Sequence, residues 1–330
     1  MATAPIIIQS TDRGIIMRYV GLSHQVNRNN RYSFLLLIAF PALLLVMFYV
    51  FFFFTDKQYT EVANEHFIRV IPFVVAGVVI WFLIAWAGHS TFIQMATGSK
   101  PLERTENKRV YNLLENLCIS QGMTMPKLYI IDDDSLNAFA SGINQKSYSV
   151  SLSKGIIEKL NDEELEGVIA HELTHIRNRD VRLLIISIVF VGIFSFLAEL
   201  AFRSLRFVGS GRRSSSDKDS KGSGAIVLIA IVVTAVAYFI SLLLRFGISR
   251  KREYLADAGA AEITKKPYAL ASALKKISGD PMIEAVESRD VAQLFIENPK
   301  LSAHKSASWD NMFSTHPPIE KRIALLEQFV

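Results

Sequence analysis

The sequence His171-Glu172-Leu173-Thr174-His175 contains two histidines four residues apart with a glutamate directly after the first. On an α-helix, positions i and i+4 lie on one face, so His171 and His175 can bind one metal ion through their imidazole nitrogens. Glu172 then lies close enough to take a proton from a water held by that ion. The pattern is typical of a zinc hydrolase site, provided that the segment is helical.

The residues around this sequence predict that it is helical. Asn161 followed three residues later by Glu164 is the pattern of a capping box, which marks the start of a helix. Apolar residues then recur at helical spacing up to Ile176. We predict a helix from Asp162 to about Arg177.

The composition indicates a membrane protein that also has polar parts. Of the 330 residues, 50% are hydrophobic and 20% are charged, and the mean hydropathy is +0.27. The net charge of +5 comes from basic residues that gather beside apolar segments, which favours anionic lipid over nucleic acid as the partner. Cys118 is the only cysteine, which excludes an intrachain disulfide and a Cys-rich metal site.

Two apolar runs predict membrane-spanning helices. Residues 32–55 and 70–88 carry no charge, and each run is long enough to cross about 30 Å of hydrocarbon as a helix. Pro41 interrupts the first run, which a membrane helix tolerates. Four arginines precede the first run, whereas two basic residues lie between the runs. The positive-inside rule therefore places the N-terminus and the chain after Gly88 in the cytoplasm.

Two further apolar runs leave the topology open. Residues 183–202 contain Glu199 as their only charge, and residues 225–244 contain none. The Ser- and Gly-rich connection, 203–224, holds six basic residues, which the positive-inside rule would keep in the cytoplasm. Either both runs cross and the loop is translocated, or both form a hairpin that enters the membrane without traversing it.

A catalytic zinc site needs a third protein ligand, and Glu253 is our candidate. Asp257, four residues further along a stretch of helical character, could accept the N–H of a zinc-bound histidine. The alternative is that both carboxylates belong to a solvated helix face. If Glu253 joins His171 and His175 at one ion, the apolar segment between them must cross the membrane an even number of times.

Taken together, these motifs resemble those of the HtpX type of membrane metallopeptidase, a gluzincin group related to the CaaX prenyl endopeptidases. The resemblance covers nearly the whole chain. Its features are His171 to His175, Glu253 to Asp257, Asn137-Ala138-Phe139-Ala140, and Ser314-Thr315-His316-Pro317-Pro318 followed by Arg322.

The resemblance implies roles for individual residues. It implies one Zn²⁺ per chain, bound by His171, His175 and Glu253, with Glu172 as the general base. It implies that Asn137, Ala138, Phe139 and Ala140 form an active-site edge strand that binds substrate through main-chain hydrogen bonds; the alternative is an ordinary strand. It also implies that His316 and Arg322 stabilise the oxyanion, whereas His316 could instead cap the last helix.

We therefore expect a mainly α membrane protein with transmembrane helices and a cytoplasmic α+β gluzincin-like metallopeptidase domain that contains a small sheet. The expected parts are a cytoplasmic N-terminal segment (1–31), a two-span anchor (32–93), a first catalytic part (94–182), an apolar hairpin (183–248, with the basic loop 203–224) and a second catalytic part (249–330).

The expected function is cleavage of membrane or other proteins, misfolded ones among them, from the cytoplasmic side of a bacterial inner membrane as part of quality control and stress response. The expected partners are polypeptide substrates and the lipid bilayer, without nucleic acid. Two alternatives are a CaaX-type prenyl endopeptidase, whose chains are longer and have more spans, and a non-catalytic membrane protein that binds or transports zinc.

Overall fold

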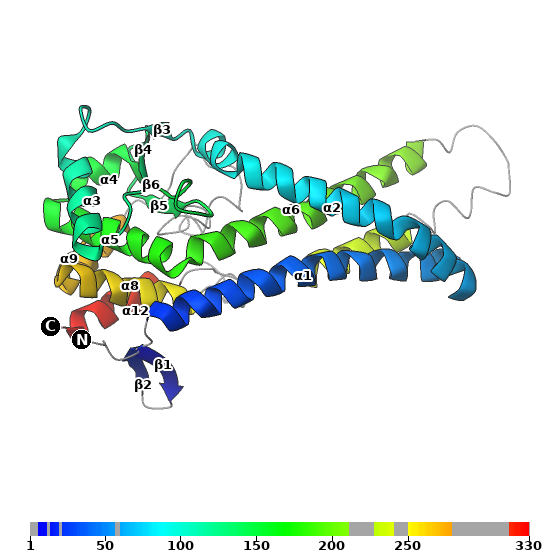
Figure 1. The fold of residues 1–330 in the computed structure, drawn as a ribbon, viewed down its shortest axis with the longest axis horizontal. Coiled ribbons are helices and arrows are strands. Elements are labelled where there is room, and N and C mark those ends of the chain that lie inside the picture. The colour runs from blue at the N-terminus through cyan, green and yellow to red at the C-terminus, as the bar shows by residue number, and fades with distance from the viewer. Residues whose placement is uncertain are drawn as a thin grey trace. The chain divides into compact units, whose positions relative to one another are not determined.

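The computed structural model describes residues 6–11, 14–19, 22–56, 60–210, 228–240, 250–278 and 317–329. These residues are mostly helical, with a small mixed sheet (Figure 1). The chain divides into two compact units, of which the first combines Met1–Tyr32, Gly88–Ile185 and Ile248–Val330, and the second combines Ser33–Ala87 and Ile186–Gly247. The predicted fold class, a mainly α membrane protein with a small α+β part, is confirmed; the finer division into five parts stays a prediction.

Among the residues that the structure describes, three helices are long and apolar enough to cross a membrane. They are α1 (Leu22–Thr55), α2 (Thr60–Thr97) and α6 (Asp180–Ser210), and their candidate spans are Ser23–Thr55, Thr60–Thr97 and Asp180–Arg203. Pro41 lies inside α1 without ending it, as the sequence predicted. Of the fourth apolar run, the helix Leu228–Ile240 is described, and the ends of that run lie outside the described residues.

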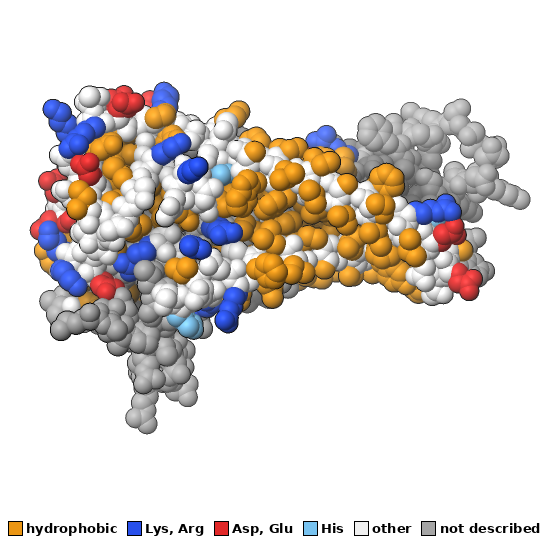
Figure 2. Space-filling model, in the orientation of Figure 1, with side chains coloured by type: hydrophobic (Ala, Val, Ile, Leu, Met, Phe, Trp, Pro, Cys, Tyr) orange, Lys and Arg blue, Asp and Glu red, His pale blue; other side chains and the backbone are white. Residues whose placement is uncertain are grey.

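The second unit consists of apolar helices packed through aromatic rings. Phe190 of α6 stacks on Phe40 of α1 with ring centroids 5.1 Å apart, and on Phe82 of α2 at 5.9 Å. Large apolar side chains also point outward, such as Phe73 at 76% exposure, and Figure 2 shows hydrophobic side chains covering these helices. Such a surface is unfavourable in water but suits lipid tails, so these helices are membrane-embedded.

The first unit contains a four-stranded sheet in the order β3-β4-β6-β5. β4 (Lys127–Ile131) runs parallel to β6 (Ser149–Ser153), while β3 (Lys100–Pro101) and β5 (Ala138–Ser141) are antiparallel to their neighbours. The β-prone stretches of the sequence thus form strands, and β5 lies at one edge. A second, two-stranded sheet of β1 (Ile6–Thr11) and β2 (Gly14–Tyr19) was not predicted.

Helix α5 (Asp162–Asn178) begins and ends close to where the sequence predicts. The Asn161 side chain accepts a hydrogen bond from the Glu164 N–H, and the Glu164 carboxylate accepts one from the Asn161 N–H. The capping box is therefore confirmed. α3 (Lys108–Gln121) begins after Asn107, which caps it by accepting a hydrogen bond from the Val110 N–H.

The C-terminal part of the first unit consists of α8 (Arg250–Thr264), α9 (Pro267–Ile277), α12 (Ile319–Leu326) and the short 3₁₀ helix η2 (Glu327–Phe329). The sequence around Glu253 and Asp257 has helical character, which by itself marks no break between α8 and α9. The structure breaks the helix at Lys265, whose φ of 58° is left-handed, because Pro267 has no N–H to continue the preceding helix. α9 packs against α5, and α8 packs against both.

Glu164 joins α5 to α9, and replacing it by glutamine should destabilise the first unit in a pH-dependent way. Burial raises the pKa of this carboxyl, but hydrogen bonds from Lys276, the Asn161 N–H and Ser272 outweigh it and hold the pKa below its ordinary value of 4.5. The carboxylate thus stabilises the fold above that pH, and the contribution is lost as pH falls through the lowered pKa. Glu164→Gln should cost about 1 to 3 kcal/mol at neutral pH and show a smaller difference from the parent at pH below 4.

Thermal unfolding in detergent between pH 3 and pH 8 measures this effect. Glu163→Gln is the matched control, because Glu163 lies in the same helical turn but its ion pair with Lys266 is exposed and contributes little. Equal losses in the two variants, or a Glu164→Gln loss that does not change with pH, would contradict the expectation.

Candidate metal centre

The site is built where α8 packs closely against α5. A Cβ added at Gly259 of α8 would lie 2.5 Å from Thr174 Cγ2 of α5, well inside a normal contact. Thr174 cannot easily turn aside, because it is 1% exposed and its hydroxyl donates to the Ala170 carbonyl at 2.8 Å. Glycine at 259 therefore permits the approach that brings Glu253 to the histidines of α5.

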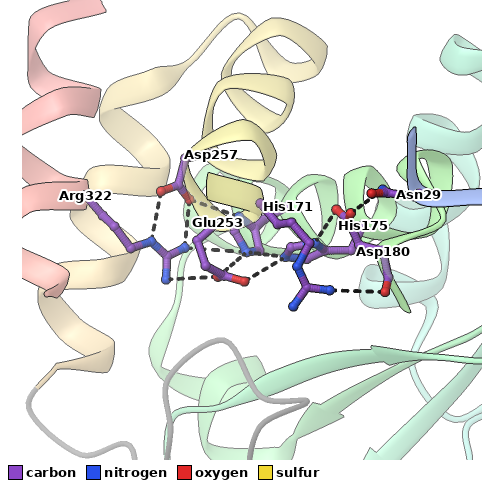
Figure 3. Close-up of polar contacts among 8 residues, drawn as sticks. Asn29, His171, His175, Asp180, Glu253, Asp257 and Arg322 are labelled. Atoms are coloured by element: carbon purple, nitrogen blue, oxygen red, sulfur yellow. Dashed lines mark hydrogen bonds and ion pairs between the residues drawn. The ribbon is translucent and has the colours of Figure 1, made fainter. Parts of the chain in front are cut away.

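The structure brings His171, His175 and Glu253 together (Figure 3). The Nε2 atoms of the two histidines are 3.1 Å apart, and each lies near a Glu253 oxygen, at 3.7 Å for His171 and 3.6 Å for His175. Tetrahedral bonds of about 2.0 Å to one ion would separate the ligand atoms by roughly 3.3 Å. The three side chains are thus spaced to hold a single ion.

Each of the two imidazoles presents its Nδ1 to a carboxylate. His171 Nδ1 lies 3.0 Å from Asp257 Oδ1, and His175 Nδ1 lies 3.1 Å from Asp180 Oδ2. A carboxylate at Nδ1 places the ring proton there and leaves a lone pair on Nε2. Two lone pairs and the Glu253 carboxylate then face one another, which is repulsive unless a cation lies between them. The donor set therefore fits a metal.

The charges around His171 also favour a cation. Burial lowers the pKa of His171, but the carboxylates of Asp257 and Glu253 outweigh it and raise that pKa to about 9. The surroundings thus stabilise positive charge at the imidazole, even though His171 is fully buried. A metal ion supplies that charge at Nε2 in place of the proton.

Glu172 is 2% exposed and lies beside the two histidines on α5. Burial raises the pKa of its carboxyl, while His171, His175 and the Ala140 N–H oppose that rise and Glu253 adds to it. A buried carboxylate with a raised pKa can both accept and return a proton near neutral pH. The environment suits a general base.

Arg322 of α12 is buried in the site, where it binds Asp257. It is 1% exposed, and its Nε and Nη2 donate to the two oxygens of Asp257 at 2.8 and 2.7 Å. Its Nη1 lies 3.8 Å from Glu253 Oε2. Burial raises the pKa of Asp257, but Arg322 outweighs it and keeps that pKa below the ordinary value. Arg322 thus keeps Asp257 charged beneath His171.

The proposed substrate strand reaches the same site. Asn137 directly precedes β5, whose residues Ala138, Phe139 and Ala140 are buried. The Ser153 N–H of β6 donates to the Asn137 carbonyl, so the alternation of an antiparallel pair directs the main-chain groups of Phe139 toward β6 and those of Ala138 and Ala140 away from it. On that side, β5 pairs with no strand among the described residues. His316 lies outside the described residues.

Sequence reasoning missed two buried residues at this site, Asp180 and Asn29. Asp180 faces His175, and Asn29 Nδ2 donates to Asp180 Oδ1 at 2.6 Å. The available signals were slight: Asp180 ends a run of four polar residues (177–180) shortly before an apolar run, and Asn29 also lies just before an apolar run. Neither spacing predicts a contact with the histidines.

The chain is similar to one known protein family and to several known proteins. The model of peptidase family M48 matches residues 104–330. The protease HtpX homolog of Bacteroides fragilis is 61% identical over 324 residues, covering 95% of this chain and 100% of the relative. That of Lactobacillus acidophilus is 36% identical over 310 residues, covering 93% and 99%. The crystal structure of S. mikatae Ste24p has a TM-score of 0.48 and 19% identity, covering 92% of this chain and 67% of that chain.

Enlarging Gly259 should push α8 away from α5 and weaken metal binding. In Gly259→Ala the new methyl group meets the Thr174 side chain, and overpacking of this kind costs about 1 to 3 kcal/mol. We expect lower metal content after the purified protein is loaded with metal, measured by elemental analysis, and a lower melting temperature. Thr174→Ser removes the clashing methyl group and keeps the hydroxyl, so the double variant should recover most of the metal. Full metal content in Gly259→Ala alone would contradict the expectation.

Proposed function

This chain belongs to peptidase family M48, and from that premise we propose that it is a zinc-dependent endopeptidase that cleaves membrane proteins from the cytoplasmic side of a bacterial inner membrane. Membership makes it a metallopeptidase, and its three long apolar helices make it an integral membrane protein. Our proposal goes further on three points: the metal is zinc, the active site faces the cytoplasm, and the substrates are membrane proteins.

The convergence of two imidazole nitrogens and one carboxylate supports zinc as the metal. His171, His175 and Glu253 form a set of two nitrogen donors and one oxygen donor within 4.8 Å of one another. Catalytic zinc sites typically have three such protein ligands and one position left open for water or substrate. None of the three ligands lies within the candidate membrane spans, which argues against a transport site at the bilayer midplane.

When held by His171, His175 and Glu253, Zn²⁺ would supply Lewis acidity, which would lower the pKa of bound water to about 7 and polarise the substrate carbonyl. Glu172 takes a proton from the attacking water and delivers it to the nitrogen of the leaving amine, so its carboxylate is regenerated at the end. Its burial beside His171 and His175 keeps bulk water from competing for that proton. The products are a new carboxylate and a new amine.

Arg322 and His316 remain our candidates for stabilising the oxyanion. Arg322 donates to Asp257 from Nε and Nη2, and its Nη1 lies 3.8 Å from Glu253 Oε2. The guanidinium therefore lies at the proposed metal site, where we assign it to the developing negative charge. The same residue holds Asp257 against His171, and so acts on the metal ligand as well as on the substrate. His316 precedes Pro317 and Pro318, which lead into α12, the helix that carries Arg322.

The edge of β5 that pairs with no described strand supports an extended polypeptide as the substrate. Main-chain groups of Ala138 and Ala140 face that edge, where the Ala138 N–H donates to Asn137 Oδ1 and the Ala140 N–H contacts the Glu172 carboxylate. A peptide added as an antiparallel strand would therefore run past the general base. Recognition through the main chain tolerates many side chains, as expected of an enzyme that removes misfolded proteins in quality control.

The distribution of charge supports a cytoplasmic active site. Four arginines precede the uncharged run 32–55 and two basic residues lie between it and the run 70–88, so the positive-inside rule retains the N-terminal side in the cytoplasm. The ligands lie on both sides of residues 183–244 in the sequence yet within 4.8 Å of one another. That segment therefore returns to the side from which it enters the membrane.

The decisive test of the mechanism is Glu172→Gln. The amide cannot accept the proton from water, so cleavage of casein or a membrane substrate in detergent should fall by at least about 10³-fold, a loss of roughly 4 kcal/mol in transition-state stabilisation. Zinc content should remain near one per chain, because the three ligands are unchanged. Full activity in this variant would refute the role of Glu172.

Glu253→Ala is the control that separates metal binding from proton transfer. It leaves Glu172 intact and removes one ligand, so both zinc content and cleavage should fall. Zinc binding as tight as that of the parent would remove Glu253 from the ligand set. Zinc should be added only at the assay, since the purified enzyme is expected to cleave itself.

Cysteine labelling in spheroplasts tests the side of the membrane. Cys118 is 2% exposed and burial raises its pKa to about 11, so it reacts poorly, and it is replaced by alanine in this experiment. We expect a membrane-impermeant maleimide to label Glu61→Cys, which lies between the uncharged runs 32–55 and 70–88, and to spare Thr105→Cys until detergent is added. Both positions are exposed. The opposite labelling pattern would place the active site outside.

A further inference from the structure

The two histidines of α5 are held by carboxylates from different parts of the chain. Asp257, which faces His171, belongs to α8, the helix that also carries Glu253. Asp180, which faces His175, is the first residue of α6. The support of His175 therefore depends on how the chain passes from α5 into α6.

A left-handed residue makes the contact between Asp180 and His175 possible. On one continuous helix, a residue five positions further lies about 140° away around the axis, so Asp180 would point elsewhere. Arg179 ends α5 with a φ of 61°, which turns the chain and returns Asp180 to His175. A residue with a side chain adopts this conformation only when its surroundings hold it there. The Arg179 side chain is fixed by Asn30, whose Oδ1 accepts from Nη1 at 3.1 Å.

Asn29 of α1 holds the carboxylate that faces His175 (Figure 3). Its Nδ2 donates to Asp180 Oδ1 at 2.6 Å and to the Asn178 carbonyl at 2.8 Å. Asn29 and Asp180 are 2% and 3% exposed, so water does not replace these bonds. With Oδ1 engaged by the amide, the carboxylate is oriented with Oδ2 toward His175 Nδ1.

The turn between α5 and α6 is also contacted by α8, the helix that carries Glu253. Arg252 Nη1 donates to the Asp180 carbonyl at 3.2 Å, and Glu253 is the next residue of α8. Asn29 of α1 and Arg252 of α8 thus both hydrogen-bond to the turn between α5 and α6. This turn links the position of His175 to that of Glu253 without relying on a metal.

We propose that Asn29 and Asp180 are positioning residues of the metal centre, and that α1, the helix carrying the first membrane span, is therefore part of the active site. Asn29 orients Asp180, Asp180 holds the proton on His175 Nδ1, and His175 Nε2 is left as a metal ligand. Asn29 lies outside the 104–330 region matched by the family model. This inference rests on the proposed zinc site and extends it to the N-terminal segment.

Zinc retention tests the inference without relying on activity. Full-length Glu172→Gln protein, which cannot cleave itself, serves as the parent and is loaded with zinc in detergent. A chromophoric chelator then measures how fast each variant releases the ion. Loss of such outer hydrogen bonds typically weakens metal affinity 10- to 100-fold, so we expect release from Asp180→Asn to be about 10 to 100 times faster, and from Asn29→Ala about 10 times faster.

Ser33→Ala is the matched control on the same helix. Ser33 lies four residues after Asn29, is 3% exposed, and its hydroxyl has no hydrogen-bond partner, so its release rate should equal that of the parent. Asn29→Asp has the shape of asparagine but lacks the donor and adds a charge next to Asp180. It should release zinc at least as fast as Asn29→Ala, and it decides the outcome if the alanine variant does not fold.

Two further readouts separate positioning from general instability. Co²⁺ substitution should give a visible absorption band that is shifted in the Asp180 and Asn29 variants and unchanged in Ser33→Ala. Melting of the metal-free proteins measures structural damage alone. If the Asn29 and Asp180 variants melt earlier but release zinc at the parent rate with an unshifted band, the positioning role is overturned. If the parent itself binds no zinc, the proposed function fails instead.

Discussion

The site depends on keeping two imidazole Nε2 atoms 3.1 Å apart, with a carboxylate facing both of them. Three electron-rich groups do not adopt this arrangement unaided, because they repel one another in a buried pocket. The fold holds the two imidazoles through their Nδ1 atoms, since Asp257 lies at Nδ1 of His171 and Asp180 lies at Nδ1 of His175. A metal ion between the three groups would remove the repulsion. Three other features support the same arrangement. They are the close approach of α8 to α5 at Gly259, the two hydrogen bonds from Arg322 to Asp257, and the turn at Arg179.

The same arrangement links the peptidase chemistry to the membrane. The ligands come from helices on either side of the apolar segment 183–244, so the chain must return to its starting side before it can complete the site. α1 and α6 both carry candidate spans, and both contribute buried polar residues, Asn29 and Asp180, to the histidine's surroundings. A membrane anchor that only tethered the enzyme would not need either residue.

Features set by neighbouring residues were predicted well from the sequence. The capping box at Asn161 and Glu164 lies within one helical turn, and α5 has nearly the predicted bounds. The apolar runs became long helices for the same reason, since backbone groups in lipid must bond within the segment. The break at Lys265 and the β1–β2 hairpin were missed, because weak local preferences there compete with packing.

By itself, the sequence determined that this is a membrane metallopeptidase with a His171 and His175 pair, because i and i+4 spacing on a helix is a local property. The sequence offered Glu253 and Asp257 as candidates, the resemblance favoured them over a solvated helix face, and the tertiary structure brought them to the histidines. Only the tertiary structure decided that Arg322 binds Asp257 and that Asn29 reaches Asp180, 151 positions away in the sequence. Such contacts depend on the path of the backbone through Arg179 and on helix packing, and neither leaves a periodic pattern in the sequence.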